Sequence, residues 1–252
     1  MRRHMVRVLL AAAATAGALL TAGLAGAPAA GAAPSGTHTG GYPVFYTSSQ
    51  GGYTATGRWF RFVATTVTMP PKSPLYPTAL VVLNGPGYAG PLYVGVRSGG
   101  GPTSVGWSAG VPPFGMGGAA FTKVNPKVGD TVRIALYYDR SGGNVTGTAT
   151  DLTTGATQSA VVGGKKGWVY NAAEVACWLP KNPSPPAKDL RLWQFNDSAV
   201  TTYTGTHGTI TGPWATNEVI DTTNGTSSGR VVMSPSFLFN NGASFGAWLR
   251  AK

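Results

Sequence analysis

Side chains alternate between two sets, with a period of two residues, along positions 59 to 68. One set is Trp59, Arg61, Val63, Thr65 and Val67, and the other is Phe60, Phe62, Ala64, Thr66 and Thr68. This is the period of a β-strand, in which successive side chains point to opposite faces of a sheet. Met69-Pro70-Pro71 ends the segment, since proline cannot donate a hydrogen bond to a sheet. This segment therefore favours a chain that folds around β-sheets.

Segments of the same kind recur at short intervals and are separated by turn residues. We predict further strands at residues 79–83, 92–97, 131–138, 144–151, 157–162, 173–179, 190–195, 230–233 and 244–249. No segment after residue 32 has the apolar spacing of an amphipathic helix, and the 37 glycines and 19 prolines favour turns. The sequence therefore predicts an all-β fold, a β-sandwich of two antiparallel sheets. The glycine-rich segment 99–118 is predicted as either a long loop or irregular strands.

Residues 1–32 have the pattern of a secretion signal peptide. Arg2, Arg3 and Arg7 precede an apolar run, and Ala30-Gly31-Ala32 matches the small-residue site that signal peptidase cleaves. No second apolar stretch long enough to span a membrane follows. We therefore expect a secreted, extracellular protein without a membrane anchor, with a flexible leader at residues 33–48 and the sandwich domain at residues 49–252.

The predicted mature chain is strongly basic. Loss of the signal removes three arginines and no acid, so the net charge falls from +11 to +8. Anionic cell-envelope polymers or polysaccharides would attract such a protein. The basic residues form no run and accompany no nucleic-acid-binding motif, so no nucleic-acid partner is expected, and the expected state is a monomer. With Cys177 as its single cysteine, the chain forms no internal disulfide and depends on packing for stability.

Two short motifs and the histidines carry no function in this sequence. Residues 85–90 match G-x-G-x-x-G and residues 106–110 match G-x-S-x-G, but neither motif leads into the helix that a nucleotide site or a nucleophile elbow needs. His38 and His207, the two histidines of the mature chain, have no second metal ligand nearby in sequence. We therefore predict neither a metal site nor a cofactor.

Glu174 is the candidate catalytic residue, because glutamate occurs only twice in the chain, at positions 174 and 218. Alternation along residues 173–179 places Ala173, Val175, Cys177 and Leu179 on one face and Glu174, Ala176 and Trp178 on the other. The first face is apolar and is predicted to be core, with Cys177 as a small buried hydrophobe. The second face pairs a carboxyl group with an indole, and loss of water there would raise the carboxyl pKa. Such a group can act as a general acid or base, although a solvent-facing glutamate is the alternative.

Three segments stand out as landmarks: Ser-Gly-Gly-Asn-Val-Thr-Gly-Thr-Ala-Thr-Asp-Leu-Thr-Thr-Gly-Ala-Thr at 141–157, Asn-Ala-Ala-Glu at 171–174 and Leu-Trp-Gln-Phe-Asn-Asp-Ser at 192–198. In order and spacing they resemble the landmarks of the eqolisins, the secreted glutamic endopeptidases. The resemblance extends from about residue 48 to residue 249 and includes Val-Gly-Asp-Thr at 128–131. It implies a concanavalin-like sandwich of two curved sheets, with a substrate cleft on the concave face and Glu174 as the catalytic glutamate.

The chain also departs from the eqolisin pattern. The family pairs its glutamate with a glutamine on an earlier strand, and Tyr93 stands at that place here. A phenol can still donate a hydrogen bond to an oxyanion. Trp107 lacks the acidic neighbours that the family has around its cleft tryptophan, and Gln50 stands where the family usually has a tryptophan.

Two functions remain open from the sequence. In the first, the protein is a secreted endopeptidase in which Glu174 activates water and Tyr93 replaces the missing amide, with a polypeptide substrate contacting Trp178, Trp107 and Gln50. In the second, it is an inactive sandwich whose aromatic floor of Trp178, Trp107 and Tyr93 binds extended peptides or cell-envelope glycans.

Overall fold

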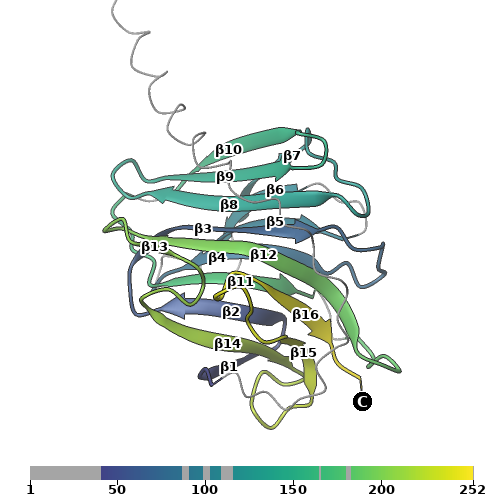
Figure 1. Ribbon diagram of the computed structural model, residues 1–252. Coiled ribbons are helices and arrows are strands. Elements are labelled where there is room, and N and C mark those ends of the chain that lie inside the picture. Colours follow the sequence, from purple (N-terminus) through teal and green to yellow (C-terminus); the bar gives the residue numbers. More distant parts are fainter. Residues whose placement is uncertain are drawn as a thin grey trace, which may run out of the picture. The chain divides into compact units, whose positions relative to one another are not determined.

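The computed structural model describes residues 41–86, 91–98, 103–108, 116–164, 166–179 and 183–251, with the backbone alone described for 103–108 and 116–118. The described residues belong to one compact unit and contain strands, turns and loops but no helix (Figure 1). No membrane-spanning helix is therefore found among them. The predicted signal peptide lies outside the described residues, as do the first residues of the predicted leader.

Sixteen strands are formed by the described residues. They are β1 Val44–Thr47, β2 Gln50–Thr56, β3 Phe60–Thr68, β4 Thr78–Asn84, β5 Leu92–Arg97, β6 Thr103–Ser108, β7 Met116–Phe121, β8 Thr131–Asp139, β9 Asn144–Asp151, β10 Thr157–Gly163, β11 Ala172–Trp178, β12 Leu190–Thr202, β13 His207–Gly208, β14 Ala215–Thr222, β15 Val231–Pro235 and β16 Phe245–Leu249.

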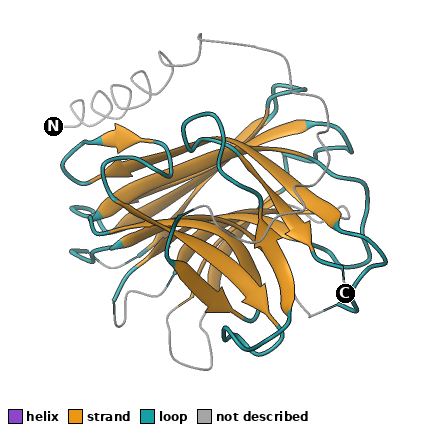
Figure 2. Cartoon of the chain, turned by 60° about the horizontal axis from the view of Figure 1, so that its bottom comes forward, coloured by secondary structure: helices purple, strands orange, loops and turns teal. Residues whose placement is uncertain are grey.

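The strands pair in one continuous order that folds back on itself into two layers. The front layer consists of β10, β9, β8, β3 and β12, and the back layer of β14, β2, β11, β4, β5, β6 and β7. β16 and β15 connect the two layers at one side, while β3 and β8 pack against β4, β5 and β11. Figure 2 shows the strands stacked in two layers. All pairs are antiparallel except that between β1 and β14. The predicted all-β sandwich is therefore confirmed.

Apolar side chains from both layers fill the space between them. The front layer contributes Val63, Val67, Ile134, Leu136 and Val145, and the back layer contributes Val81, Leu83, Val94, Val175 and Cys177. Each of these side chains has at most 1% of its surface exposed. The complete burial of Cys177 confirms its prediction as a core residue, and burial raises its pKa well above the usual value.

The structure adds strands that the alternation did not predict. β2 carries two adjacent glycines and β14 carries Asn217, Glu218 and Asp221, so neither resembles an apolar strand in sequence. Both lie inside the sheet, where pairing on both edges outweighs their weak local preference. Segment 99–118 contains β6 and part of β7, as the second alternative predicted. The predicted leader is corrected at its end, because β1 pairs with β14.

Gly52 in β2 has no room for a side chain. It pairs with Ala176 of β11 on one side and with Val219 of β14 on the other. A Cβ atom at position 52 would collide with the backbone carbonyl oxygen of Val175. The backbone cannot move aside easily, because β2 is held on both edges.

We expect Gly52→Ala to reduce the free energy of unfolding by about 1–3 kcal/mol, the usual cost of overpacking. Urea denaturation followed by tryptophan fluorescence measures the change. Gly163→Ala is the matched control, because nothing lies within 4 Å of a Cβ atom built at Gly163 in the outermost strand, β10. Equal stability of the two variants would contradict the close approach at Gly52.

Candidate active site

The outer face of the back layer carries the candidate residues in three rows across neighbouring strands. Each row takes one residue from β2, β11, β4 and β5, in that order. The first row is Thr54, Glu174, Val82 and Tyr93, the second is Gly52, Ala176, Leu80 and Gly95, and the third is Gln50, Trp178, Thr78 and Arg97. Each row lies two residues from the next, which is about 7 Å along a strand. Ala173, Val175 and Cys177 point the other way, into the core. The alternation inferred for residues 173–179 is therefore present.

Glu174 is the most unusual carboxyl group on this face. Only 5% of its surface is exposed. Its Oε2 accepts a hydrogen bond of 3.3 Å from Nδ2 of Asn84, and its Oε1 has no hydrogen-bond partner among the described residues. Burial raises the pKa of Glu174 from 4.5 to about 7. The group therefore changes protonation state near neutral pH, and its Oε1 is a buried acceptor without a partner among the described residues.

Asn84 is a site residue that the sequence reasoning did not identify. It is the last residue of β4, beyond the predicted strand, and pairs with Ala172 of β11. This register places its amide diagonally beside Glu174, close enough to donate to the carboxylate. The sequence does show a polar residue, Asn84, at the end of an apolar strand. Placing its amide beside Glu174, however, requires knowing that β4 pairs with β11.

Tyr93 shares a row with Glu174 but lies two strands away, with Val82 between them. Strands are spaced by nearly 5 Å, so the two Cα atoms are about 10 Å apart. Tyr93 is half-buried, and burial raises the pKa of its phenol. The phenol therefore stays protonated and can donate a hydrogen bond at neutral and acidic pH.

Gln50 and Trp178 pair with each other at the far row of the same face. Four residues along β11 separate Trp178 from Glu174, which corresponds to about 13 Å. Gln50 therefore does not lie beside the carboxyl group. Trp107 lies in β6 opposite Leu92, and its side chain is outside the described part of the structure.

Asp221 is a second buried carboxyl group. Both of its side-chain oxygens lack a hydrogen-bond partner among the described residues, and burial raises its pKa from 3.8 to about 7. It lies close enough to Cys177 to contribute to the raised pKa of that thiol. No group of three histidine, cysteine or acidic side chains that could hold a metal ion occurs within the described ranges.

Comparison with known proteins relates this fold to glutamic peptidases. No protein-family model and no curated protein matches the chain. Among solved structures, scytalido-glutamic peptidase with a transition-state analogue inhibitor is similar with a TM-score of 0.57 and 17% identity, covering 80% of this chain and 98% of that one. SCP-B, a member of the eqolisin family in complex with the tripeptide Ala-Ile-His, has a TM-score of 0.53 and 18% identity over the same shares. The chain therefore has a fold similar to that of the eqolisin peptidases.

We expect Glu174→Gln to change stability in a pH-dependent way. The folded-state pKa of about 7 exceeds the ordinary value of 4.5, so the wild type loses stability as the pH rises from about 4 to 7, because over this range the carboxyl group ionises in the unfolded chain but stays protonated in the folded protein. Gln cannot ionise. The substitution should therefore raise the free energy of unfolding, relative to the wild type, by about 3 kcal/mol more at pH 8 than at pH 4. Urea denaturation at both pH values measures this difference.

Asp189 provides a control of opposite sign. Burial by itself raises its pKa, but hydrogen bonds from the Ala251 amide and the Arg250 guanidinium outweigh burial and leave the pKa lowered. Asp189→Asn should therefore destabilise the protein more at pH 8 than at pH 3, because the stabilising charge is lost. A Glu174→Gln effect that is the same at pH 4 and pH 8 would contradict the raised pKa.

Proposed function

We propose that this protein hydrolyses peptide bonds, with Glu174 as general base and then general acid. The observation that carries the proposal is the buried carboxyl group of Glu174, which has one oxygen without a partner among the described residues and a pKa of about 7. A base with a pKa near the working pH combines a useful ionised fraction with a strong affinity for protons. The similarity in fold to two solved glutamic peptidases supports the same reaction class.

The proposed reaction has two proton transfers through the same carboxyl group. In the first, ionised Glu174 takes a proton on Oε1 from a water molecule while the water oxygen attacks the carbonyl carbon of the substrate. In the second, Glu174 returns that proton to the amide nitrogen, and the carbon–nitrogen bond breaks to release an amine and a carboxylic acid. The hydrogen bond from Asn84 fixes Oε2 and leaves Oε1 for both transfers.

Tyr93 is the proposed donor to the oxyanion that forms on the substrate. Its phenol is protonated because burial raises its pKa, and it lies in the same row as Glu174. A substrate carbonyl placed above Val82 would lie between the two side chains. This arrangement replaces the glutamine of the eqolisin pattern with a donor that has a single proton.

The proposed substrate is an extended polypeptide that lies across the back layer. The row beside the Glu174 row contains the small residues Gly52, Ala176 and Gly95 together with Leu80. Trp178 and Gln50 lie beyond this row and would contact side chains of the substrate. The solved structure of SCP-B holds a tripeptide, which supports a peptide ligand for this fold.

Secretion is part of the proposal. It rests on the arginines, the apolar run and the small-residue cleavage site of residues 1–32. An extracellular protein would meet polypeptides released from other cells, and the basic charge would hold it near anionic envelope polymers.

We expect the wild type to cleave a denatured, fluorescently labelled protein and Glu174→Gln to lose at least a factor of about 100 in kcat/KM, because amide cannot transfer the proton. Since the reaction begins with ionised Glu174, the wild-type kcat/KM should rise about tenfold per pH unit below pH 7 and level off above it. Tyr93→Phe should reduce kcat by about 100-fold if its phenol stabilises the oxyanion.

Glu218→Gln is the matched control, because it makes the same change at the only other glutamate. It should retain cleavage, provided that circular dichroism shows the same strand content. Full activity of Glu174→Gln would overturn the glutamic mechanism. A wild type that cleaves at no pH but binds peptides in a Trp178-dependent manner would replace the peptidase with a peptide-binding sandwich.

A further inference from the structure

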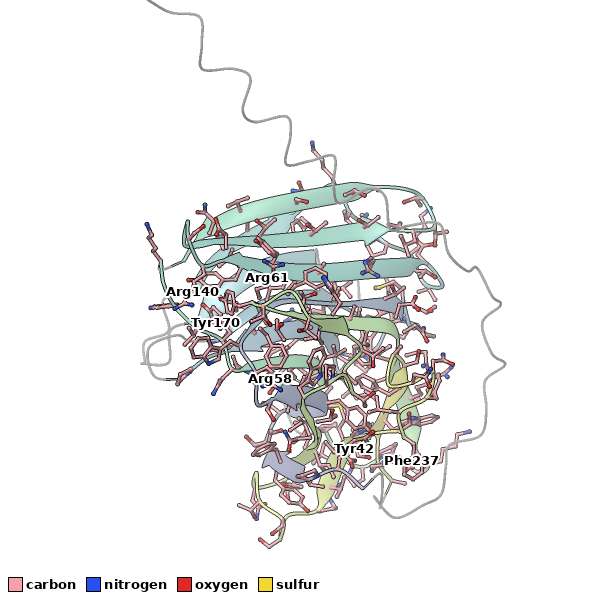
Figure 3. The ribbon with its side chains drawn as sticks, turned by 60° about the vertical axis from the view of Figure 1, so that its left-hand side comes forward. Tyr42, Arg58, Arg61, Arg140, Tyr170 and Phe237 are labelled. Carbon is pink, nitrogen blue, oxygen red and sulfur yellow. The ribbon has the colours of Figure 1, made fainter. Side chains whose placement is uncertain are left out.

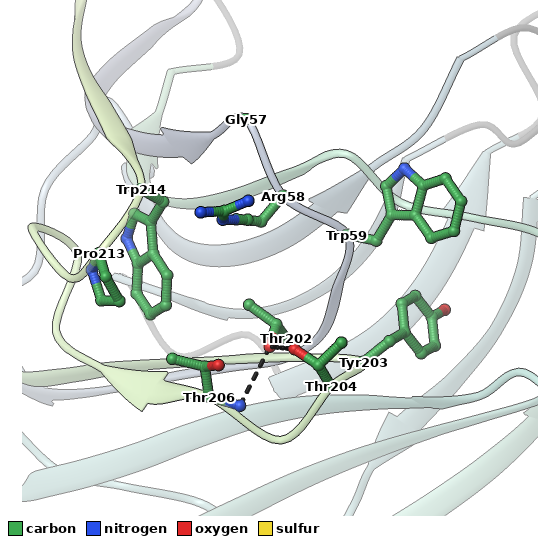
Figure 4. Close-up of a pocket in the computed structure, with 9 residues that line it drawn as sticks. All are labelled: Gly57, Arg58, Trp59, Thr202, Tyr203, Thr204, Thr206, Pro213 and Trp214. Carbon is green, nitrogen blue, oxygen red and sulfur yellow. Dashed lines mark hydrogen bonds between the residues drawn. The ribbon is translucent and has the colours of Figure 1, made fainter.

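A pocket of about 550 Å³ lies at the turn where the chain passes from β2 of the back layer to β3 of the front layer. Gly57, Arg58 and Trp59 of this turn form one side (Figure 4). The segment that joins β12 to β13 forms another side, and Pro213 and Trp214 complete it. Gly57 is three residues beyond Thr54, the β2 neighbour of Glu174, which corresponds to about 10 Å along the chain. None of the residues that line the pocket belongs to the candidate active site, so the two are separate.

Aromatic rings form the walls of this pocket. Trp59 has 55% of its surface exposed, which is unusual for so large an apolar side chain. Trp214 is held firmly, because its Nε1 donates a hydrogen bond of 3.0 Å to the carbonyl oxygen of Ile210 and its ring packs edge-on against Phe60 at 5.5 Å. Tyr203 also lines the pocket. Trp214 is thus a fixed apolar surface of the pocket.

Three arginines gather around these rings. Arg58 lines the pocket, and the Arg140 guanidinium lies 5.7 Å from the ring centres of both Trp59 and Tyr203. Arg61 is close enough to Tyr203 to affect the pKa of its phenol. Figure 3 shows Arg58, Arg61 and Arg140 on the same side of the molecule. The pocket therefore combines aromatic walls with a concentration of positive charge.

No acidic side chain neutralises these arginines within the described residues. The single ion pair recorded there joins Arg250 to Asp189. Asp139 precedes Arg140 in the sequence, but its carboxylate accepts hydrogen bonds from the backbone amide and the hydroxyl of Ser141. The guanidinium groups thus remain available to an anion from outside the protein.

Threonine hydroxyls complete the lining. Thr202 Oγ1 accepts a hydrogen bond of 3.1 Å from the Thr206 amide and lies 2.9 Å from Oγ1 of Thr204 (Figure 4). These contacts hold the hydroxyls in place at the wall of the pocket. Fixed hydroxyls can exchange hydrogen bonds with the hydroxyls of a ligand.

We propose that this pocket binds an acidic polysaccharide, with a sugar ring against the aromatic walls and its carboxylate facing the arginines. The planar fork of a guanidinium group matches a carboxylate with two hydrogen bonds. The volume lies within the range usual for small-ligand pockets. A single-stranded nucleic acid would need successive stacking surfaces along a groove, whereas these rings surround one pocket. In this proposal, the arginines at the pocket use part of the positive charge of the chain to bind an acidic polysaccharide. The proposal does not depend on peptidase activity.

Isothermal titration calorimetry with a short oligogalacturonate tests the proposal. The wild type should bind it, and Trp59→Ala and Arg58→Ala should each weaken binding at least about tenfold, because each removes a direct contact. Both side chains are exposed, so the variants should keep the fold. Arg230→Ala, which removes an exposed arginine with the same change in charge, should bind like the wild type.

Any one of four results would overturn the proposal. One is absence of binding to oligogalacturonate in 100 mM salt. Another is equal binding of an uncharged malto-oligosaccharide of the same length, which would remove the role of the arginines. A third is a loss of oligogalacturonate binding in Arg230→Ala as large as that in Arg58→Ala. A fourth is binding of polyglutamate or oligo(dT) as tight as that of oligogalacturonate. Either of these two results would mean that binding is a general attraction between opposite charges.

Discussion

β11 is hydrogen-bonded on both edges, to β2 and to β4, and this double pairing sets where Glu174, Asn84 and Trp178 lie relative to one another. A shift of one residue would move Glu174 into the core and Val175 out of it. The apolar set of Ala173, Val175 and Cys177 prevents that shift, because all three side chains are completely buried between the layers. The same packing that stabilises the sandwich therefore holds Glu174 on the outer face.

The position of Glu174 is unfavourable for folding in its ionised form. Its carboxyl group is buried with one hydrogen bond, from Asn84, and one oxygen without a partner among the described residues. Such a group is stable when protonated and costs free energy when ionised. Asp221 adds a second buried carboxyl group of this kind. The protein cannot compensate with an internal disulfide, since Cys177 is its single cysteine, so the apolar core must provide the stability.

The sequence predicts a strand correctly where the alternation of its side chains matches the faces that the strand presents in the folded sandwich. Strands such as β5 and β9 were predicted with the bounds that the structure has, because their side chains alternate. β2 and β14 were missed, because glycines and acids in a strand become intelligible only when the neighbouring strands are known. The same limit applies to the site. Glu174 could be found from alternation along one strand, whereas Asn84 required the pairing of β4 with β11, and the pocket around Trp59 required three separate turns and loops to be brought together.

Burial raises the pKa of Glu174 to about 7 and so provides a group that exchanges protons near neutrality. Because the chain has only two glutamates, protein labelled with ¹³C at the glutamate side-chain carboxyl gives two signals for a pH titration by NMR. One signal should titrate near pH 7, and the same signal should be absent in Glu174→Gln. A Glu174 signal that titrates near pH 4, as in an ordinary solvent-exposed carboxyl group, would contradict the account.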